Sequence, residues 1–209
     1  MSKDQEKNWS ERSIELSKFY KGKERGLEAY LHIFGLTRED LDGKKVLDLG
    51  AGPTMQFSQD IKEANLDTSV AELSPDFIFD DIRHKALESN PSANAVVGLG
   101  QELPFASESF DSVFIVHVLD HVSYEIMTRL LSEALRVTKK GGRVYCGPVY
   151  SYIRADLAKD KNFKKFLNDT GIKLSQSDVP VDYGEERLYD KISGTHYDDM
   201  PYTKIVLEK

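Results

Sequence analysis

The chain has 209 residues, of which 40% are hydrophobic and 30% charged, an ordinary balance for a water-soluble globular protein. Its formal net charge of −7 disfavours sequence-independent binding of DNA or RNA, because such binding relies on basic surface. Cys146 is the only cysteine, which excludes intramolecular disulfides and cysteine-cluster metal sites, and we expect no metal site.

The start of the chain is polar and lacks the apolar core of a signal peptide. No apolar run approaches the length of a membrane span. We therefore expect a cytoplasmic protein with a small-molecule substrate and neither a nucleic-acid nor a membrane partner. It would be a monomer or a homodimer, with one domain over residues 1–209.

In chain order, a helical cap is predicted first, over residues 1–43. Apolar residues recur at helical spacing from Glu11 to Phe34, and Thr37 resembles a further helix start.

From residue 44 to residue 150, short apolar runs alternate with amphipathic segments. Strands are predicted at Lys45–Leu49, Thr68–Leu73, Ala95–Gly98, Ser112–Val118 and Arg143–Val149. Helices are predicted at Thr54–Asn65, Pro75–Leu87 and Ser123–Val137. This alternation indicates βαβ units, and hence a mostly parallel sheet covered on both faces.

Residues 151–209 depart from that rhythm. A helix is predicted at Asp156–Thr170, followed by strands at Gly171–Leu174 and Tyr202–Glu208. An acidic, tyrosine-containing loop over residues 178–201 separates these strands. Two strands joined by a loop without a helical pattern suggest an antiparallel edge on the parallel sheet.

The stretch VLDLGAGPTMQF, Val46 to Phe57, has the glycine-rich turn of a nucleotide site. It lacks the lysine that a P-loop needs. A dinucleotide fingerprint would have a third glycine where Met55 stands, and Pro53 removes an N–H donor that a pyrophosphate would use. S-adenosylmethionine has no phosphate, and needs close backbone approach and an acceptor for its ribose hydroxyls. Glu72, near the end of the next predicted strand, can provide that acceptor.

Four blocks then resemble one family at matching spacing: VLDLGAGPT, AELSP, VVGLGQELPFASESFDSVFIVHVLDHV and EALRVTKKGGRVY. They are similar to the class I S-adenosylmethionine-dependent methyltransferases, in particular to the branch that methylates small molecules such as quinone precursors. The resemblance covers residues 44–150. It implies an α/β, Rossmann-like, doubly wound three-layer sandwich with a seven-stranded, mostly parallel sheet whose last strand is antiparallel.

The resemblance also implies cofactor contacts, position by position. Asp48 matches the acid that faces the amino-acid end of S-adenosylmethionine, and Glu72 matches the ribose acid. Gly50, Ala51 and Gly52 match the segment that passes under the cofactor, and Thr54 follows them as a further expected contact. Leu73 matches the residue that packs on the adenine face. Thr54 stands where many members of the family have a glycine.

One block departs from the family form G-D-A-x-x-L-P, in which the acid accepts from the adenine amino group. Here Leu99 replaces that acid and cannot accept a hydrogen bond. Gly100, Gln101 and Glu102 follow as expected cofactor contacts, and Gln101 offers a substitute acceptor.

Val116, His117, Asp120 and His121 lie at and after the end of the fourth predicted strand, where the family places cofactor methyl and substrate. His121 is the candidate proton acceptor, with Asp120 to orient it. The alternative is that His121 only caps this loop. His117 is carried over as a cofactor contact, although its apolar neighbours also favour a packing role.

The resulting hypothesis is a methyltransferase that moves a methyl group from S-adenosylmethionine to an O, N or C atom of a small molecule by in-line displacement. Candidate substrate walls are Tyr20, Tyr30, Tyr183 and His196. The acidic loop favours a cationic acceptor or is merely a solvated face. Two alternatives remain, a non-catalytic S-adenosylmethionine-binding protein on the same fold and a nicotinamide oxidoreductase.

Overall fold

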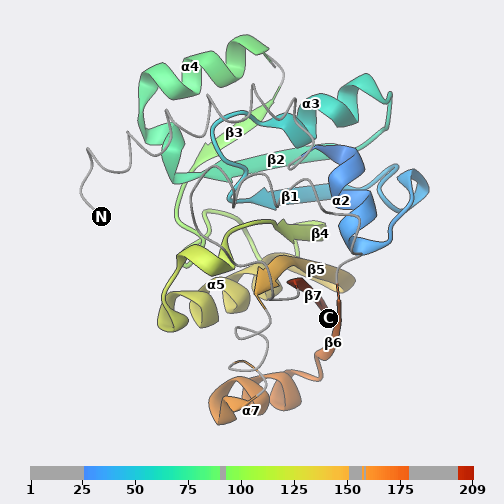
Figure 1. Cartoon of the computed structure of the whole chain (residues 1–209), viewed down its shortest axis with the longest axis vertical. Helices are drawn as coiled ribbons and strands as arrows, with labels where there is room; N and C mark the ends of the chain where they lie inside the picture. Colours follow the sequence, from blue (N-terminus) through green and yellow to red (C-terminus); the bar gives the residue numbers. More distant parts are fainter. Residues whose placement is uncertain (1–25, 90–92, 151–156, 158, 179–201) are drawn as a thin grey trace.

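The structure is a computed structural model, and it describes residues 26–89, 93–150, 157, 159–178 and 202–209. Within these residues the chain forms one seven-stranded sheet in the order β3-β2-β1-β4-β5-β7-β6, which Figure 1 shows from top to bottom. The strands are β1 Lys45–Leu49, β2 Ser69–Ser74, β3 Asn94–Val97, β4 Phe110–Ile115, β5 Thr138–Tyr150, β6 Lys173–Asp178 and β7 Tyr202–Glu208.

The first five strands pair in parallel, and β7 pairs antiparallel with both β5 and β6. The predicted sheet, with its antiparallel last strand, is therefore confirmed. Strand order reverses between β1 and β4, and ligands of open α/β sheets bind at such a reversal, outside the carboxyl ends of the strands.

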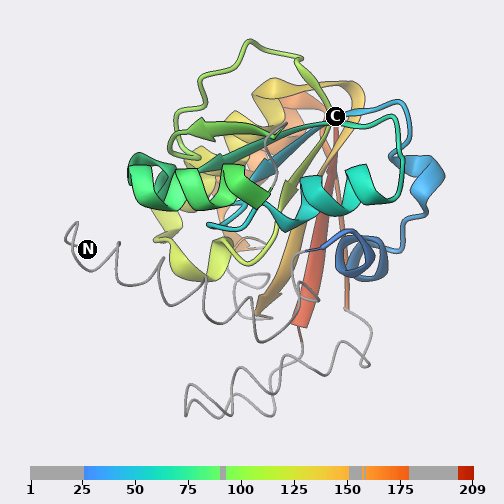
Figure 2. The same cartoon turned by 90° about the horizontal axis from the view of Figure 1, so that it is seen from above.

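Helices cover both faces of the sheet, as the doubly wound prediction requires. They are α2 Leu27–Phe34, α3 Gln56–Glu63, α4 Asp80–Ser89, α5 Tyr124–Val137 and α7 Lys161–Thr170. Figure 2 shows α3 and α4 in a row along one side of the sheet. Helices α2 and α3 pack in one apolar cluster with Val46 and Phe114, whereas α5 and α7 pack in another with Leu47 and Val113.

The alternation along β1 explains this division. Successive side chains of a strand point to opposite faces, so Leu47 and Leu49 face α5 while Val46 and Asp48 face α2 and α3. Asp48 is thus a carboxylate on an otherwise apolar face, only 2% exposed.

Several predicted elements have different bounds in the structure, and strand β5, for example, begins at Thr138 rather than Arg143. Three further differences adjoin the carboxyl ends of the strands. Helix α3 begins at Gln56 rather than Thr54, because Met55 adopts a left-handed conformation with φ 51° and serves as the N-cap. The predicted helix Pro75–Leu87 is two elements, η2 Pro75–Ile78 and α4, since Phe79 between them is extended. Strand β4 ends at Ile115, three residues earlier than predicted.

The ends of the chain differ in how much the structure describes. Of the predicted helical segment Glu11–Phe34 it describes α2, and of the acidic loop it describes only Asp178, the last residue of β6. The predicted C-terminal helix begins at Lys161 with Asp160 as its N-cap, whose carboxylate accepts from the Phe163 N–H. Among the described residues, no helix is long and apolar enough to cross a membrane.

Candidate functional site

The glycine turn lies at the carboxyl end of β1, where the sheet order reverses. The Gly50 and Ala51 N–H groups both donate to the Leu73 carbonyl at the end of β2, at 2.8 and 3.2 Å. Gly50 has a φ of 83°, and a Cβ added to it would lie 2.3 Å from Cγ2 of Val118. A side chain is therefore excluded twice at Gly50, by backbone conformation and by the loop after β4.

The rest of the turn leads into α3. Gly52 also has a positive φ, of 69°, and Thr54 is half-buried. Met55 is fully buried against Phe77 of η2, and this packing holds its left-handed conformation.

Two carboxylates face the same side of the sheet beside this turn. Asp48 of β1 and Glu72 of β2 are in register, and residues paired in this way share a face. Asp48 accepts hydrogen bonds from the Tyr30 hydroxyl of α2, 3.1 Å from each carboxylate oxygen. Glu72 is fully buried, and its Oε1 accepts from the Ser58 N–H in the first turn of α3, at 2.8 Å.

The predicted adenine loop follows β3. Leu99 is 53% exposed, and its carbonyl accepts from the Glu102 N–H at 3.1 Å. A Cβ on Gly100 would lie 2.9 Å from side-chain atoms of Leu49 and Leu130, so this loop packs closely over β1 and α5. Gln101 is half-buried and Glu102 is exposed.

An ion pair from α5 fastens the same loop. Arg136 donates to the Leu103 and Phe105 carbonyls, at 3.1 and 2.8 Å, and to the carboxylate of Glu133. Glu133 in turn accepts from the Leu103 N–H at 2.8 Å. The hydrogen bond from Arg136 holds the pKa of Glu133 below its ordinary value, against the opposing effect of burial.

The residues after β4 lie beside the glycine turn, since Val118 approaches Gly50 closely. Val116 is buried, and His117 is half-buried with a left-handed φ of 54°. Asp120 and His121 share the short 3-10 helix Leu119–His121, where Asp120 is half-buried and His121 is exposed. His117 is thus a loop residue and not part of the strand.

The predicted substrate walls are only partly described. Tyr20, Tyr183 and His196 lie outside the described residues. Tyr30 is fully buried, and its described polar contact is with Asp48, so its role beside a substrate stays a prediction. Within the described part of the chain, no group of three or more His, Cys, Asp or Glu side chains is arranged to hold a metal ion.

Three contacts of the site were not predicted from the sequence: those of Tyr30, Ser58 and the Glu133–Arg136 pair. The spacing of Glu133 and Arg136 on a predicted helix signals an ion pair. Nothing local signals that this pair reaches the adenine loop, about 30 positions earlier in the sequence. Cys146, by contrast, is fully buried in β5, which raises the pKa of its thiol and makes it unreactive.

Comparison with known proteins identifies this core. Residues 47–146 match the family model described as a methyltransferase domain. This core belongs to the methyltransferase domain family. The chain is 32% identical over 150 residues to demethylmenaquinone methyltransferase of Beutenbergia cavernae, an alignment that covers 71% of this chain and 59% of that relative. The chain spans about half the length of the curated relatives it matches.

Solved structures of low sequence identity share the fold. Phosphoethanolamine N-methyltransferase 2 of Haemonchus contortus, solved with S-adenosylmethionine, has a TM-score of 0.58 at 17% identity, over 87% of this chain and 52% of that one. The [4+2]-cyclase SpnF has a TM-score of 0.54 at 15% identity, over 80% and 75% of the two chains. At such identities these likenesses concern the fold alone.

The predicted class I S-adenosylmethionine-dependent methyltransferase domain is therefore confirmed, with S-adenosylmethionine as its cofactor. The described residues fit this cofactor at the turn, where Gly50 keeps the backbone free of side chains, and at the carboxylates of Asp48 and Glu72. They differ from the usual contacts of the family at Leu99, whose exposed apolar side chain cannot accept a hydrogen bond from the adenine amino group.

Proposed function

We propose that the protein transfers a methyl group from S-adenosylmethionine to an oxygen, nitrogen or carbon atom of a small-molecule acceptor. One observation carries the proposal: Asp48 and Glu72 are paired in register beside the glycine turn, at the edge of the sheet where the strand order reverses. A nucleoside with a charged amino-acid tail needs carboxylate acceptors at two points, and this edge offers both.

S-adenosylmethionine supplies a methyl group bound to positively charged sulfur, which leaves as a neutral thioether. The residues of the chain then have mainly to bind the cofactor and to orient it toward the acceptor. Glu72 accepts from the ribose hydroxyls, Asp48 accepts from the amino-acid end, and the turn at Gly50 lets the backbone approach closely. Holding cofactor and acceptor in line provides much of the acceleration of such a transfer.

A quinone precursor is the acceptor class that the relatives favour, because the curated proteins that match are named demethylmenaquinone methyltransferases. Incubation of the protein with methyl-labelled S-adenosylmethionine and a demethylated quinone tests this assignment. Label in the quinone supports the proposal. Label that appears only in other compounds of a metabolite extract would assign another acceptor.

His121 is the proposed proton acceptor, with Asp120 as its neighbour on the same 3-10 helix. The exposure of His121 supports this role, because a base must reach the acceptor. We expect His121→Ala to lower turnover roughly a hundredfold while S-adenosylhomocysteine still binds. The matched control is His84→Ala, since His84 is exposed on α4 and bonds the backbone of its own helix. Unchanged turnover of His121→Ala would remove the assignment.

A second candidate, a non-catalytic S-adenosylmethionine-binding protein, is motivated by Leu99, whose side chain offers no acceptor to the adenine amino group. Calorimetric titration with S-adenosylmethionine, S-adenosylhomocysteine and NAD separates the candidates. Binding of the first two compounds without turnover on any acceptor would favour the non-catalytic protein. Binding of NAD alone would favour the oxidoreductase and overturn the main proposal.

A further inference from the structure

The Tyr30 side chain links α2 to the acid at the end of β1. Its hydroxyl lies 3.1 Å from both Oδ1 and Oδ2 of Asp48, and both residues are buried. A phenol at this distance donates one proton that the two oxygens share, which fixes the plane of the carboxylate.

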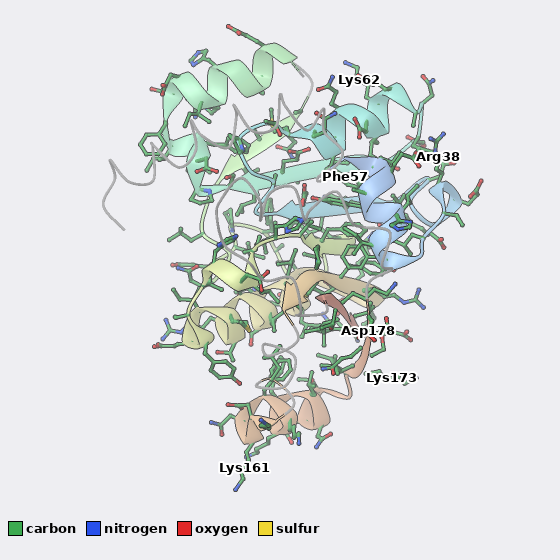
Figure 3. All side chains as sticks on the ribbon, viewed as in Figure 1. Arg38, Phe57, Lys62, Lys161, Lys173 and Asp178 are labelled. Carbon is green, nitrogen blue, oxygen red and sulfur yellow. The ribbon has the colours of Figure 1, made fainter. Side chains whose placement is uncertain are left out.

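Aromatic packing leaves the Tyr30 ring little freedom. The ring stacks on Phe57 of α3, with centroids 4.5 Å apart and an interplanar angle of 19°, and it tilts against Phe114 of β4 at 5.4 Å. Figure 3 labels Phe57 where α3 meets α2. Because both neighbouring rings belong to the central fold, the Tyr30 hydroxyl is held in place relative to the sheet.

The helix that carries Tyr30 is also anchored at both ends. At its N-terminus the Leu27 N–H donates to Asp60 Oδ2 of α3, at 2.8 Å. Near its C-terminus the Ile33 carbonyl accepts from Lys204 Nζ of β7, also at 2.8 Å. Two separate elements of the core thus fix the position of α2, and with it the hydroxyl that reaches Asp48.

We propose that Tyr30 is a positioning residue, which orients the Asp48 carboxylate to bind the ammonium group at the amino-acid end of S-adenosylmethionine. The inference rests on the proposed function and deepens it. A hydrogen bond to a charged group is stronger than one between neutral groups, so its loss leaves the Asp48 carboxylate less well ordered. Tyr30 acts through Asp48 and need not touch the cofactor itself.

The test compares two ligands. S-adenosylhomocysteine has the amino-acid end, and 5′-methylthioadenosine has the same nucleoside without it. We expect Tyr30→Phe to weaken binding of S-adenosylhomocysteine about tenfold and to leave the Kd of 5′-methylthioadenosine unchanged. A merely structural role for Tyr30 would weaken both ligands alike or neither, and either result would overturn the inference.

Tyr145→Phe is the matched control. Tyr145 is buried in the same aromatic cluster, stacked on Phe114 at 4.9 Å, but its electrostatic partner is Arg143 and not Asp48. This variant should keep the wild-type Kd for S-adenosylhomocysteine. An equal loss in both variants would mean that any buried hydroxyl of the cluster affects binding, and would count against Tyr30.

A double-mutant cycle completes the test. If Tyr30 acts through Asp48, Tyr30→Phe should cause no further loss of S-adenosylhomocysteine binding in the Asp48→Asn background. A full tenfold further loss there would overturn the inference while leaving the proposed function intact. Absence of S-adenosylhomocysteine binding to the unchanged chain would overturn the proposed function, and this inference with it.

Discussion

At the scale of single residues, Glu72 combines full burial with a hydrogen bond from the Ser58 N–H. The N–H comes from the first turn of α3, whose partial positive charge favours a carboxylate. We expect Glu72→Gln to keep the fold and to weaken S-adenosylhomocysteine binding about tenfold, since an amide has one acceptor oxygen instead of two. Titration calorimetry measures the change.

Glu88→Gln provides the control for this substitution, because Glu88 is exposed on α4, which η2 separates from β2 along the chain. Its Kd should equal that of the wild type. A wild-type Kd for Glu72→Gln as well would refute the ribose role of Glu72.

Leu99 permits a gain-of-affinity prediction. Its side chain is half exposed at the predicted adenine position, so a polar replacement there costs little stability. We expect Leu99→Asp to bind S-adenosylhomocysteine up to about tenfold more tightly, by accepting from the 6-amino group of adenine. The inosine analogue, which carries a carbonyl in place of that amino group, should gain nothing.

Leu99→Ala separates the new acceptor from the removal of the leucine side chain. It should bind both compounds as the wild type does. Equal tightening of both compounds by Leu99→Asp would show that the carboxylate does not read the amino group.

At the scale of elements, helix α5 holds the predicted adenine loop through Glu133 and Arg136. The Arg136 hydrogen bond lowers the pKa of Glu133 below its ordinary value of 4.5 in the folded state. A lowered folded pKa contributes stability that is present above the unfolded pKa and is lost as the pH falls through the folded pKa. We expect Glu133→Gln to lower the free energy of unfolding by about 1 kcal/mol at pH 7. When the pH falls below about 4.5, the free energy of unfolding should decrease less in this variant than in the wild type.

The control lies on the same helix. Glu125 pairs with Arg129 in solvent, with side-chain exposures of 76% and 66%, and surface pairs of this kind contribute little. Glu125→Gln should therefore unfold in urea at the wild-type midpoint at both pH values. An equal pH dependence for Glu133→Gln and the wild type would contradict the assignment.

The elements also show what the sequence could and could not predict. Strands β1 and β7 were predicted with the bounds that the structure has, because buried runs of apolar residues depend on local pattern alone. The start of α3 was wrong, since the conformation of Met55 depends on its burial against Phe77, more than twenty residues away.

The candidate site likewise has parts that the sequence predicts and parts that it does not. Asp48, the glycine turn and Glu72 could be predicted, because their spacing follows from one βαβ unit. The bond from Tyr30 to Asp48 could not, since it depends on how α2 is docked across the sheet. Contacts between elements that are distant in the sequence can be predicted only from the packed structure. Contacts within one βαβ unit can be predicted from the sequence pattern.

At the scale of the whole molecule, Lys204 connects the end of the chain to its first described helix. Its Nζ donates to the Ile33 carbonyl across 171 positions of sequence, and partial burial lowers its pKa. We expect Lys204→Met, which keeps the aliphatic stem, to lower the unfolding free energy by about 1 kcal/mol because the carbonyl loses its donor. Since α2 carries Tyr30, S-adenosylhomocysteine should also bind more weakly.

Urea unfolding and calorimetry measure the two effects, with Lys164→Met as control. Lys164 is exposed on α7, and its replacement should change neither quantity. If Lys204→Met loses stability but binds S-adenosylhomocysteine as before, the docking of α2 does not influence the cofactor site.

The last prediction concerns the stability of the whole protein in the presence of ligand. A ligand that binds only the folded state adds RT ln(1 + [L]/Kd) to the unfolding free energy, about 2.7 kcal/mol at a hundred times its Kd. For a chain of 209 residues this corresponds to a rise in Tm of roughly 5–10 °C. We expect S-adenosylhomocysteine to produce that rise in a thermal scan, and NAD at the same concentration to produce none. A rise with NAD alone would mean that the site recognises a dinucleotide, and would contradict the reading of Pro53 and Met55 as residues that exclude a pyrophosphate.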